Sequence, residues 1–228
     1  MQLGFPPLLS NSAAALAVCA PVSDIALAKN MRADNLYSLP EDLPVPQDDG
    51  ACDHLRGAVL PSIALQATSG VAVDLSKEGS PWVVVYCYPR TGRPDQEPLG
   101  GVETWNAIPG ARGCTPQSCA YRDHYAELRA LGATVYGLST QDTEYQNEAV
   151  GRLHLPFPLL SDARLALARA LRLPTFAFAG LELIKRLTLI ARAGRIEEVF
   201  YPVFPSDADA ERVVAWLTLG AADAYRRR

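Results

Sequence analysis

From about residue 58 to its end, the sequence alternates between runs typical of buried strands and segments with helical periodicity. Residues 82–88 and 133–139 are continuous apolar runs, the pattern of strands covered on both faces. Strands that alternate with helices predict an α/β layer structure. Other strands are expected at 63–67 and 71–75, as a hairpin, and at 157–160, 176–178, 187–191 and 196–201. A helix is expected to begin at Thr115-Pro116, with Thr115 as its N-cap and Pro116 at its first helical position. Its apolar stripe is Tyr121, Tyr125 and Leu128, and further helices are expected at 142–154, 163–171 and 207–219.

The first part of the chain has a different composition. It begins with an alanine-rich stretch and continues with Pro40, Pro44 and Pro46 in close succession. Prolines at this density block both a helix and an interior strand. We therefore expect residues 1–54 to form an extended or partly disordered N-terminal arm, and residues 55–228 to form the folded domain.

Charge and cysteine content limit the partners and the compartment. The 228 residues carry 21 Lys and Arg against 25 Asp and Glu, a net charge of −4, so no excess positive field favours nucleic acid or an anionic membrane. The longest apolar runs fall well short of the roughly 18 residues that a membrane span requires. The first basic residue, Lys29, comes too late for a secretory signal, and five cysteines do not suggest a disulfide framework. We expect a cytoplasmic protein with reduced thiols and no membrane or nucleic-acid partner.

Two cysteines mark the predicted start of the helix near residue 115. Cys114 precedes this start and Cys119 follows five residues later. The partial positive charge of a helix N-terminus favours the thiolate and lowers a cysteine pKa from its usual value of about 8.5. Arg112, Arg122 and His124 surround the pair in the sequence. We therefore predict an electropositive environment in which Cys114 is reactive.

The spacing of the two cysteines has a geometric consequence. In an intact helix, residues five apart have Cα atoms roughly 8–9 Å apart, beyond the limit of about 7 Å for a disulfide. A bond between Cys114 and Cys119 requires the start of the helix to unwind. Such a pair fits a catalytic cycle better than a structural crosslink.

The same stretch carries a resemblance to a known family. Gly113-Cys114-Thr115, Cys119 and the following Tyr121-Arg122-Asp123 resemble the active-site region of Q-type peroxiredoxins, also called bacterioferritin comigratory proteins. Tyr88-Pro89 resembles the end of the family's first core strand, and residues 157–162 resemble its strand and helix entry. Arg186-Leu187-Thr188 resembles the arginine-x-threonine start of a later strand. The likeness covers about residues 55–218.

This resemblance implies a thioredoxin-like fold with a central mixed β-sheet flanked by helices. It implies an antioxidant peroxidase in which Cys114 attacks hydrogen peroxide or a small organic hydroperoxide and becomes a sulfenic acid. Cys119 then resolves this acid as a disulfide, which thioredoxin or a similar dithiol reduces. Arg186 would stabilise the thiolate and polarise the peroxide. We also expect no cofactor, no metal, and a monomer or weak homodimer.

One part of the family pattern is missing. The Pro-x-x-x-Thr-x-x-Cys motif has Ala107 and Ala111 at its proline and threonine positions, and about twenty inserted residues, 91–112, separate Pro89 from Cys114. We predict that Thr91 folds back to supply the missing hydroxyl. Thr115 and backbone N–H groups are the alternatives.

Other interpretations of these residues stay open at this point. Cys119 could pack inward and leave a one-cysteine enzyme, and Arg186 could be a solvated charge at a strand end. His54 and His124 could join the two cysteines in a zinc site. The chain could instead be a thioredoxin-fold redox sensor or binding protein, or a structural domain with incidental thiols. Repeated turnover of peroxide with a thioredoxin system distinguishes a peroxidase from both.

Overall fold

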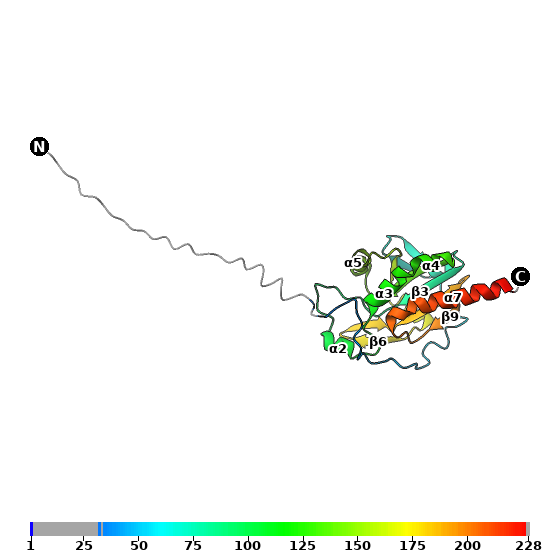
Figure 1. Cartoon of the computed structure of the whole chain (residues 1–228), viewed down its shortest axis with the longest axis horizontal. Coiled ribbons are helices and arrows are strands. Elements are labelled where there is room, and N and C mark those ends of the chain that lie inside the picture. The colour runs from blue at the N-terminus through cyan, green and yellow to red at the C-terminus, as the bar shows by residue number, and fades with distance from the viewer. Residues whose placement is uncertain (2–31, 33, 227–228) are drawn as a thin grey trace. The chain divides into compact units, whose positions relative to one another are not determined.

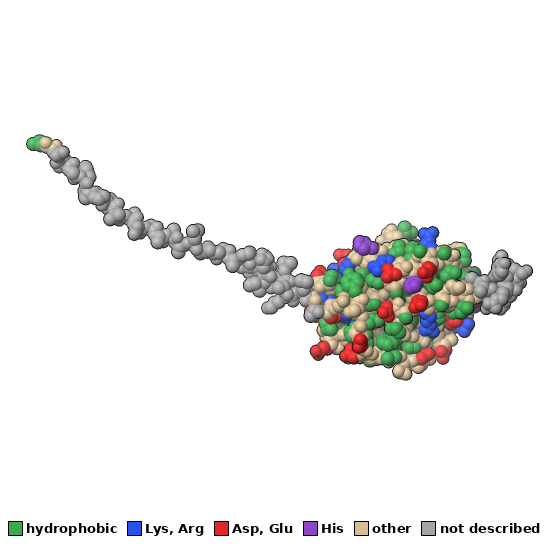
Figure 2. All heavy atoms as spheres, in the orientation of Figure 1, with side chains coloured by type: hydrophobic (Ala, Val, Ile, Leu, Met, Phe, Trp, Pro, Cys, Tyr) green, Lys and Arg blue, Asp and Glu red, His purple; other side chains and the backbone are tan. Residues whose placement is uncertain are grey.

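The computed structural model describes residues 1, 32 and 34–226, with only the backbone described for 221–226 (Figure 1). Most of the predicted arm, including Cys19, lies outside these residues. No helix in the described part of the chain is long and apolar enough to cross a membrane. Figure 2 shows acidic and basic side chains interspersed over the visible face.

A seven-stranded mixed sheet forms the centre of the domain, in the order β2-β1-β5-β4-β3-β8-β9. β3 is parallel to β4 and β4 to β5, and the other neighbours are antiparallel. The strands are β1 (Ala64–Ala67), β2 (Ala72–Asp74), β3 (Trp82–Cys87), β4 (Ala133–Ser139), β5 (Leu159–Ser161), β8 (Leu187–Arg192) and β9 (Arg195–Phe200). This arrangement confirms the predicted hairpin and the predicted central sheet.

The central strand β3 divides the core into two layers because successive side chains point to opposite faces of a sheet. Val83 and Val85 pack with apolar residues of α6 (Ala166–Leu171), whereas Val84 and Tyr86 pack under the other helices. These are α3 (Cys114–Asp123), α4 (Tyr125–Ala130), α5 (Thr143–Leu153) and α7 (Asp209–Arg226). Helices therefore flank the sheet, as the alternating pattern predicts.

Two details of the predicted helix near residue 115 are wrong. Its N-cap is Gly113, not Thr115, because Gly113 takes the left-handed conformation (φ 107°) and Cys114 is already helical. The single helix is also two helices, since His124 leaves helical geometry (ψ 5°) between α3 and α4. Tyr121 and Leu128, on either side of this break, are both buried in the same core, as expected for the apolar stripe.

Some elements have no counterpart in the prediction. The inserted loop contains a short helix, α2 (Val102–Asn106), and β7 (Leu181–Ile184) pairs with β6 (Thr175–Phe178) in a separate two-stranded sheet. Trp105 of α2 packs on Phe178 of β6, with 5.5 Å between ring centroids. The insertion is therefore anchored to this hairpin. α7 extends to residue 226, seven residues beyond the predicted end.

Residues 34–54 contain no helix or strand, in agreement with their proline content. They nevertheless pack against the domain, since Leu36 and Cys52 are buried. Asp49 binds Lys185 Nζ at 2.8 Å and accepts a hydrogen bond from the Tyr201 hydroxyl at 2.8 Å. This described part of the arm is thus fixed along the domain surface.

Candidate active site

Cys114 is the first residue of α3 and its side chain is almost completely buried. A glycine is required at the preceding position, 113, by the left-handed backbone conformation and by the lack of room for a side chain. A Cβ atom there would collide with the hydroxyl of Ser206 and approach Leu39 Cδ2 at 2.8 Å. The glycine therefore allows the chain to turn into the helix with the thiol at its first position.

Arg186 lies directly before β8 and reaches the thiol. Its Nη2 atom is 3.2 Å from Cys114 Sγ, and the residue is only 3% exposed. The guanidinium also donates to the carbonyls of Gly110, Ala111 and Arg112 at 3.1–3.2 Å. These carbonyls fix the arginine over the sulfur. The interpretation of Arg186 as a solvated charge at a strand end is wrong.

Gln117 links Arg186 to Asp209 by hydrogen bonds. Its Oε1 accepts a hydrogen bond from Arg186 Nη1, and its Nε2 donates to Asp209 Oδ2 at 2.8 Å. The same carboxylate oxygen accepts from the hydroxyls of Tyr121 at 2.9 Å and Thr188 at 2.7 Å. Burial raises the pKa of Asp209, and these three donors oppose the rise. The network fixes the orientation of the Gln117 amide.

Cys119 occupies the second turn of α3 in a different environment. It is half-buried among the apolar residues that pack on the α3 side of the sheet. Burial raises the pKa of its thiol, and the nearby Arg122 partly opposes this. All four described cysteines are free thiols. Cys52 and Cys87 are buried, and burial raises the pKa of Cys52 to about 12.

Thr91 and Thr115 line a pocket of about 130 Å³ together with Cys114. The insertion thus brings Thr91 to the same pocket as the thiol. The Thr91 hydroxyl donates its proton to Gln141 Oε1 at 3.0 Å, and its backbone N–H donates to the same oxygen at 2.9 Å. Only acceptor lone pairs of this hydroxyl are left for a ligand. Thr115 is buried at the start of the helix, where the first N–H groups have no partner within the helix.

The sequence of this chain is similar to that of known proteins. The family model described as Redoxin matches residues 55–214. The chain belongs to the Redoxin family. Chloroplastic peroxiredoxin Q from Oryza sativa subsp. japonica is 39% identical over 108 residues, which are 47% of this Redoxin chain and 41% of the rice protein. The chain thus spans about two fifths of that relative. The Gentiana triflora protein of the same name is 28% identical over 188 residues, with 80% and 77% of the two chains covered.

Solved structures confirm the thioredoxin-like fold of this Redoxin chain. Peroxidoxin BcpB from Mycobacterium tuberculosis aligns with a TM-score of 0.59 and 24% identity, over 72% of this chain and 96% of the other. The bacterioferritin comigratory protein of Xanthomonas campestris, whose structure concerns alkyl peroxide reduction, aligns with a TM-score of 0.56 and 21% identity, over 79% and 99%.

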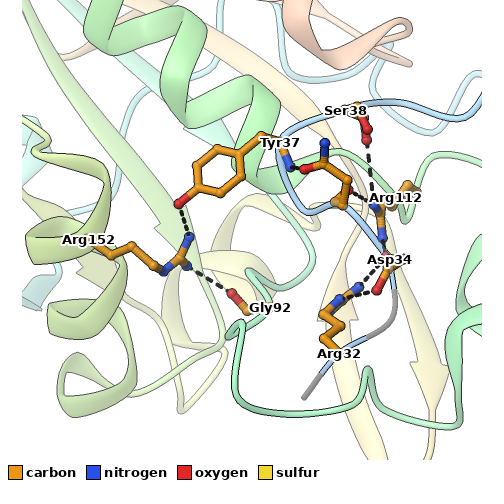
Figure 3. Close-up of polar contacts among 8 residues, drawn as sticks. Arg32, Asp34, Tyr37, Ser38, Gly92, Arg112 and Arg152 are labelled. Atoms are coloured by element: carbon orange, nitrogen blue, oxygen red, sulfur yellow. Dashed lines mark hydrogen bonds and ion pairs between the residues drawn. The ribbon is translucent and has the colours of Figure 1, made fainter.

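Two residues of the described part of the N-terminal arm, Arg32 and Leu36, line the pocket of this Redoxin chain. Arg112, which lines the pocket, donates to the Asp34 carboxylate and the Asn35 carbonyl. On α5, Arg152 donates to the Tyr37 hydroxyl at 3.3 Å and to the Gly92 carbonyl at 2.9 Å (Figure 3). The arm and the insertion are therefore held together beside Cys114.

The other two predicted charges, Arg122 and His124, lie at the end of α3 and directly after it. Arg122 donates to the carbonyl of Leu153 at 3.0 Å and partly opposes the rise in the pKa of the Cys119 thiol. His124 pairs with Glu127 at 3.1 Å. His54 contacts the Leu171 carbonyl through Nε2 at 2.9 Å. Among the side chains that the structure describes, no three of His, Cys, Asp or Glu are grouped in a way that could hold a metal ion.

Sequence reasoning did not find Gln117 and Asp209. Gln117 follows Cys114 by three residues, and this helical spacing is a local signal that could have indicated a shared helix face. Asp209 is 92 residues from Gln117 and stands among other acidic residues at the start of α7. No local pattern distinguishes it from an ordinary helix-start carboxylate.

Proposed function

We propose that this protein is a thiol-dependent peroxidase that reduces hydrogen peroxide and small organic hydroperoxides. One observation carries the proposal: Cys114 Sγ, at the start of α3, lies 3.2 Å from a buried guanidinium and lines a small pocket. A thiolate is the reactive form of cysteine, and a helix start and an arginine both favour it. The peroxiredoxin names of the relatives support the same chemistry.

In the first step, the Cys114 thiolate attacks one oxygen of the peroxide and the O–O bond breaks. The sulfur is oxidised to a sulfenic acid, and the leaving oxygen takes a proton and departs as water or an alcohol. Charge develops on this oxygen as the bond breaks. Arg186 stabilises that charge because its N–H groups are fixed before the reaction begins.

In the second step, Cys119 attacks the sulfenic sulfur, a disulfide forms and water leaves. Both cysteines belong to α3, so its first turns must unwind before the two sulfur atoms can meet. Thioredoxin or a similar dithiol then reduces the disulfide by exchange and restores both thiols. No cofactor is needed, because the thiols supply all the electrons.

Thr115 is the better candidate for a hydroxyl that donates to the peroxide. Both threonines line the pocket, but the Thr91 proton is already donated to Gln141. Thr91 instead positions the loop and offers a lone pair to the substrate. We further propose a cytoplasmic location, which the odd number of five cysteines supports, and a monomer or weak homodimer.

Mass spectrometry tests the cycle directly. The reduced protein is treated for seconds with one equivalent of hydrogen peroxide, beside Cys114→Ser and Cys119→Ser variants. We expect a Cys114–Cys119 disulfide in the wild type and a trapped sulfenic acid on Cys114 in Cys119→Ser. Oxidation that is slow and indifferent to Cys114→Ser refutes the proposal, and rapid oxidation without repeated turnover by a thioredoxin system indicates a sensor.

A further inference from the structure

The pocket beside Cys114 carries more positive charge than the rest of the chain suggests. Its lining includes four arginines and only one carboxylate, Glu97, although the whole protein has a net charge of −4. The arginines are Arg32, Arg90, Arg93 and Arg112. Small neutral hydrogen peroxide does not require this arrangement.

Two of these arginines share one carboxylate within the protein. Arg32 and Arg112 both donate to the carboxylate of Asp34, as Figure 3 shows. The Arg112 contact fixes the arm to the insertion. Their charge is shared with an acidic side chain, so they are not free to bind a ligand strongly.

Arg90 and Arg93 are held differently. The Cζ atom of each lies 4.4 Å from the centroid of the Tyr145 ring. Neither guanidinium has an ion pair or hydrogen bond with any residue in the described ranges, and the Nε atom of Arg93 is buried without a partner. A buried charged donor of this kind is costly unless an acceptor meets it.

Stacking on an aromatic ring orients a guanidinium so that its edge can bind a planar anion. The ring fixes the plane of the group by cation–π contact, while the N–H groups stay available at its edge. A carboxylate has two oxygens that match this fork. Leu99 and Trp105 add apolar surface to the same pocket. A ligand that matches this lining therefore combines a carboxylate with an apolar body.

We infer that this pocket selects organic hydroperoxides that carry a carboxylate, with Arg90 and Arg93 as the carboxylate-binding residues. The inference rests on the proposed peroxidase function and names its substrate class. The carboxylate is held at the arginines while the hydroperoxide group reaches Cys114. The thiolate then takes one oxygen, the O–O bond breaks, and the product is a hydroxy acid beside the cysteine sulfenic acid.

A matched pair of substrates tests this inference. Cumene hydroperoxide is compared with its analogue that has a carboxylate in the para position of the ring. The second-order rate constant for Cys114 oxidation is measured by stopped-flow tryptophan fluorescence, since Trp105 lines the pocket. We expect the acid to react roughly tenfold faster than the neutral compound at low salt. The difference should shrink at high ionic strength, where charges are screened within a few ångströms.

Variants assign the effect to the two arginines. In the Arg90→Gln/Arg93→Gln double variant, the ratio of the two rate constants should fall to near one. Arg93→Glu should invert the preference, which a general loss of folding would not do. Arg129→Gln is the matched control, because Arg129 also lies over a tyrosine ring, that of Tyr125, on α4 and away from the pocket. It should keep the wild-type ratio.

The outcomes separate this inference from the proposed function. If hydrogen peroxide and both hydroperoxides fail to oxidise Cys114, the peroxidase function is wrong and the inference falls with it. If the neutral hydroperoxide is reduced but the acid has no advantage, only the inference is overturned. An acid preference that survives in the double variant also overturns it, because the arginines are then not the binding site.

Discussion

The two cysteines of α3 share one short helix but have different neighbours. Cys114 is at the helix start, in contact with the Arg186 guanidinium and beside the pocket. Cys119 is one turn farther, half-buried among apolar side chains that raise the pKa of its thiol. The comparison shows that position along a helix, and not the residue type, gives the two thiols different neighbours. This difference supports the proposed roles of Cys114 in attack and of Cys119 in resolution.

The contrast between the two thiols depends most on Arg186, so replacing this arginine should have the largest effect on the rate of Cys114 oxidation. We expect Arg186→Met to lower the rate constant for Cys114 oxidation by about 10²–10³-fold, the usual effect of losing a preorganised donor at a developing charge. Arg186→Lys should recover only part of this rate, since an ammonium group lacks the forked donors. Stopped-flow oxidation by hydrogen peroxide measures both.

A second thiol provides the control for that experiment. Alkylation of Cys119 should keep its wild-type rate in Arg186→Met, because Arg186 affects only the start of the helix. Equal losses at both cysteines would mean that the substitution disrupts α3 as a whole. The contrast between the two environments would then have no local cause.

Asp209 should have the next largest effect, although it does not touch the sulfur. It holds the Gln117 amide, which in turn accepts from Arg186. We expect Asp209→Asn to slow Cys114 oxidation roughly tenfold, because an amide that replaces a carboxylate weakens charge-assisted contacts. Cys119 should again be unaffected. A wild-type rate of Cys114 oxidation in Asp209→Asn would exclude a positioning role.

The same variant has a pH signature that a purely structural change would lack. The native pKa of Asp209 is raised by burial, so the folded state binds its proton more tightly than the unfolded chain. Stability from this group is fully present below the unfolded pKa of about 4 and is lost as the pH rises through the raised native value. Urea unfolding between pH 4 and pH 7 should show this loss in the wild type and not in Asp209→Asn.

The sequence was sufficient to predict the sheet and to place Cys114 at a helix start, because the signals for both are local. β3 and β4 are continuous apolar runs, and the predicted hairpin lies at β1 and β2. Cys114 stands out because a glycine and a helix start adjoin it. The N-cap was misplaced because Thr115 has the side chain of a good cap, whereas the backbone conformation of Gly113 decides where the helix begins.

The rest of the site depends on contacts between distant parts of the chain. The Gln117–Asp209 bond joins residues 92 apart, and Arg112 meets Asp34 across 78. Such pairs leave no periodic trace in either segment. The insertion shows the same limit: Thr91 was expected at the site and lines the pocket, but its bond to Gln141 became visible only in the fold.

The smallest expected effect concerns Cys119 itself and completes the comparison. Because burial raises the pKa of its thiol, little thiolate is present near neutral pH, and disulfide formation should accelerate by up to about tenfold for each pH unit gained below that pKa. Arg122 opposes the rise, so Arg122→Gln should slow this second step a few-fold at pH 7, while the first step keeps its rate. Quenched-flow mass spectrometry at pH 6, 7 and 8 separates the two steps, with Arg129→Gln as the control. A second step that does not depend on pH would contradict this expectation, because the unwinding of α3, and not the formation of the Cys119 thiolate, would then limit disulfide formation.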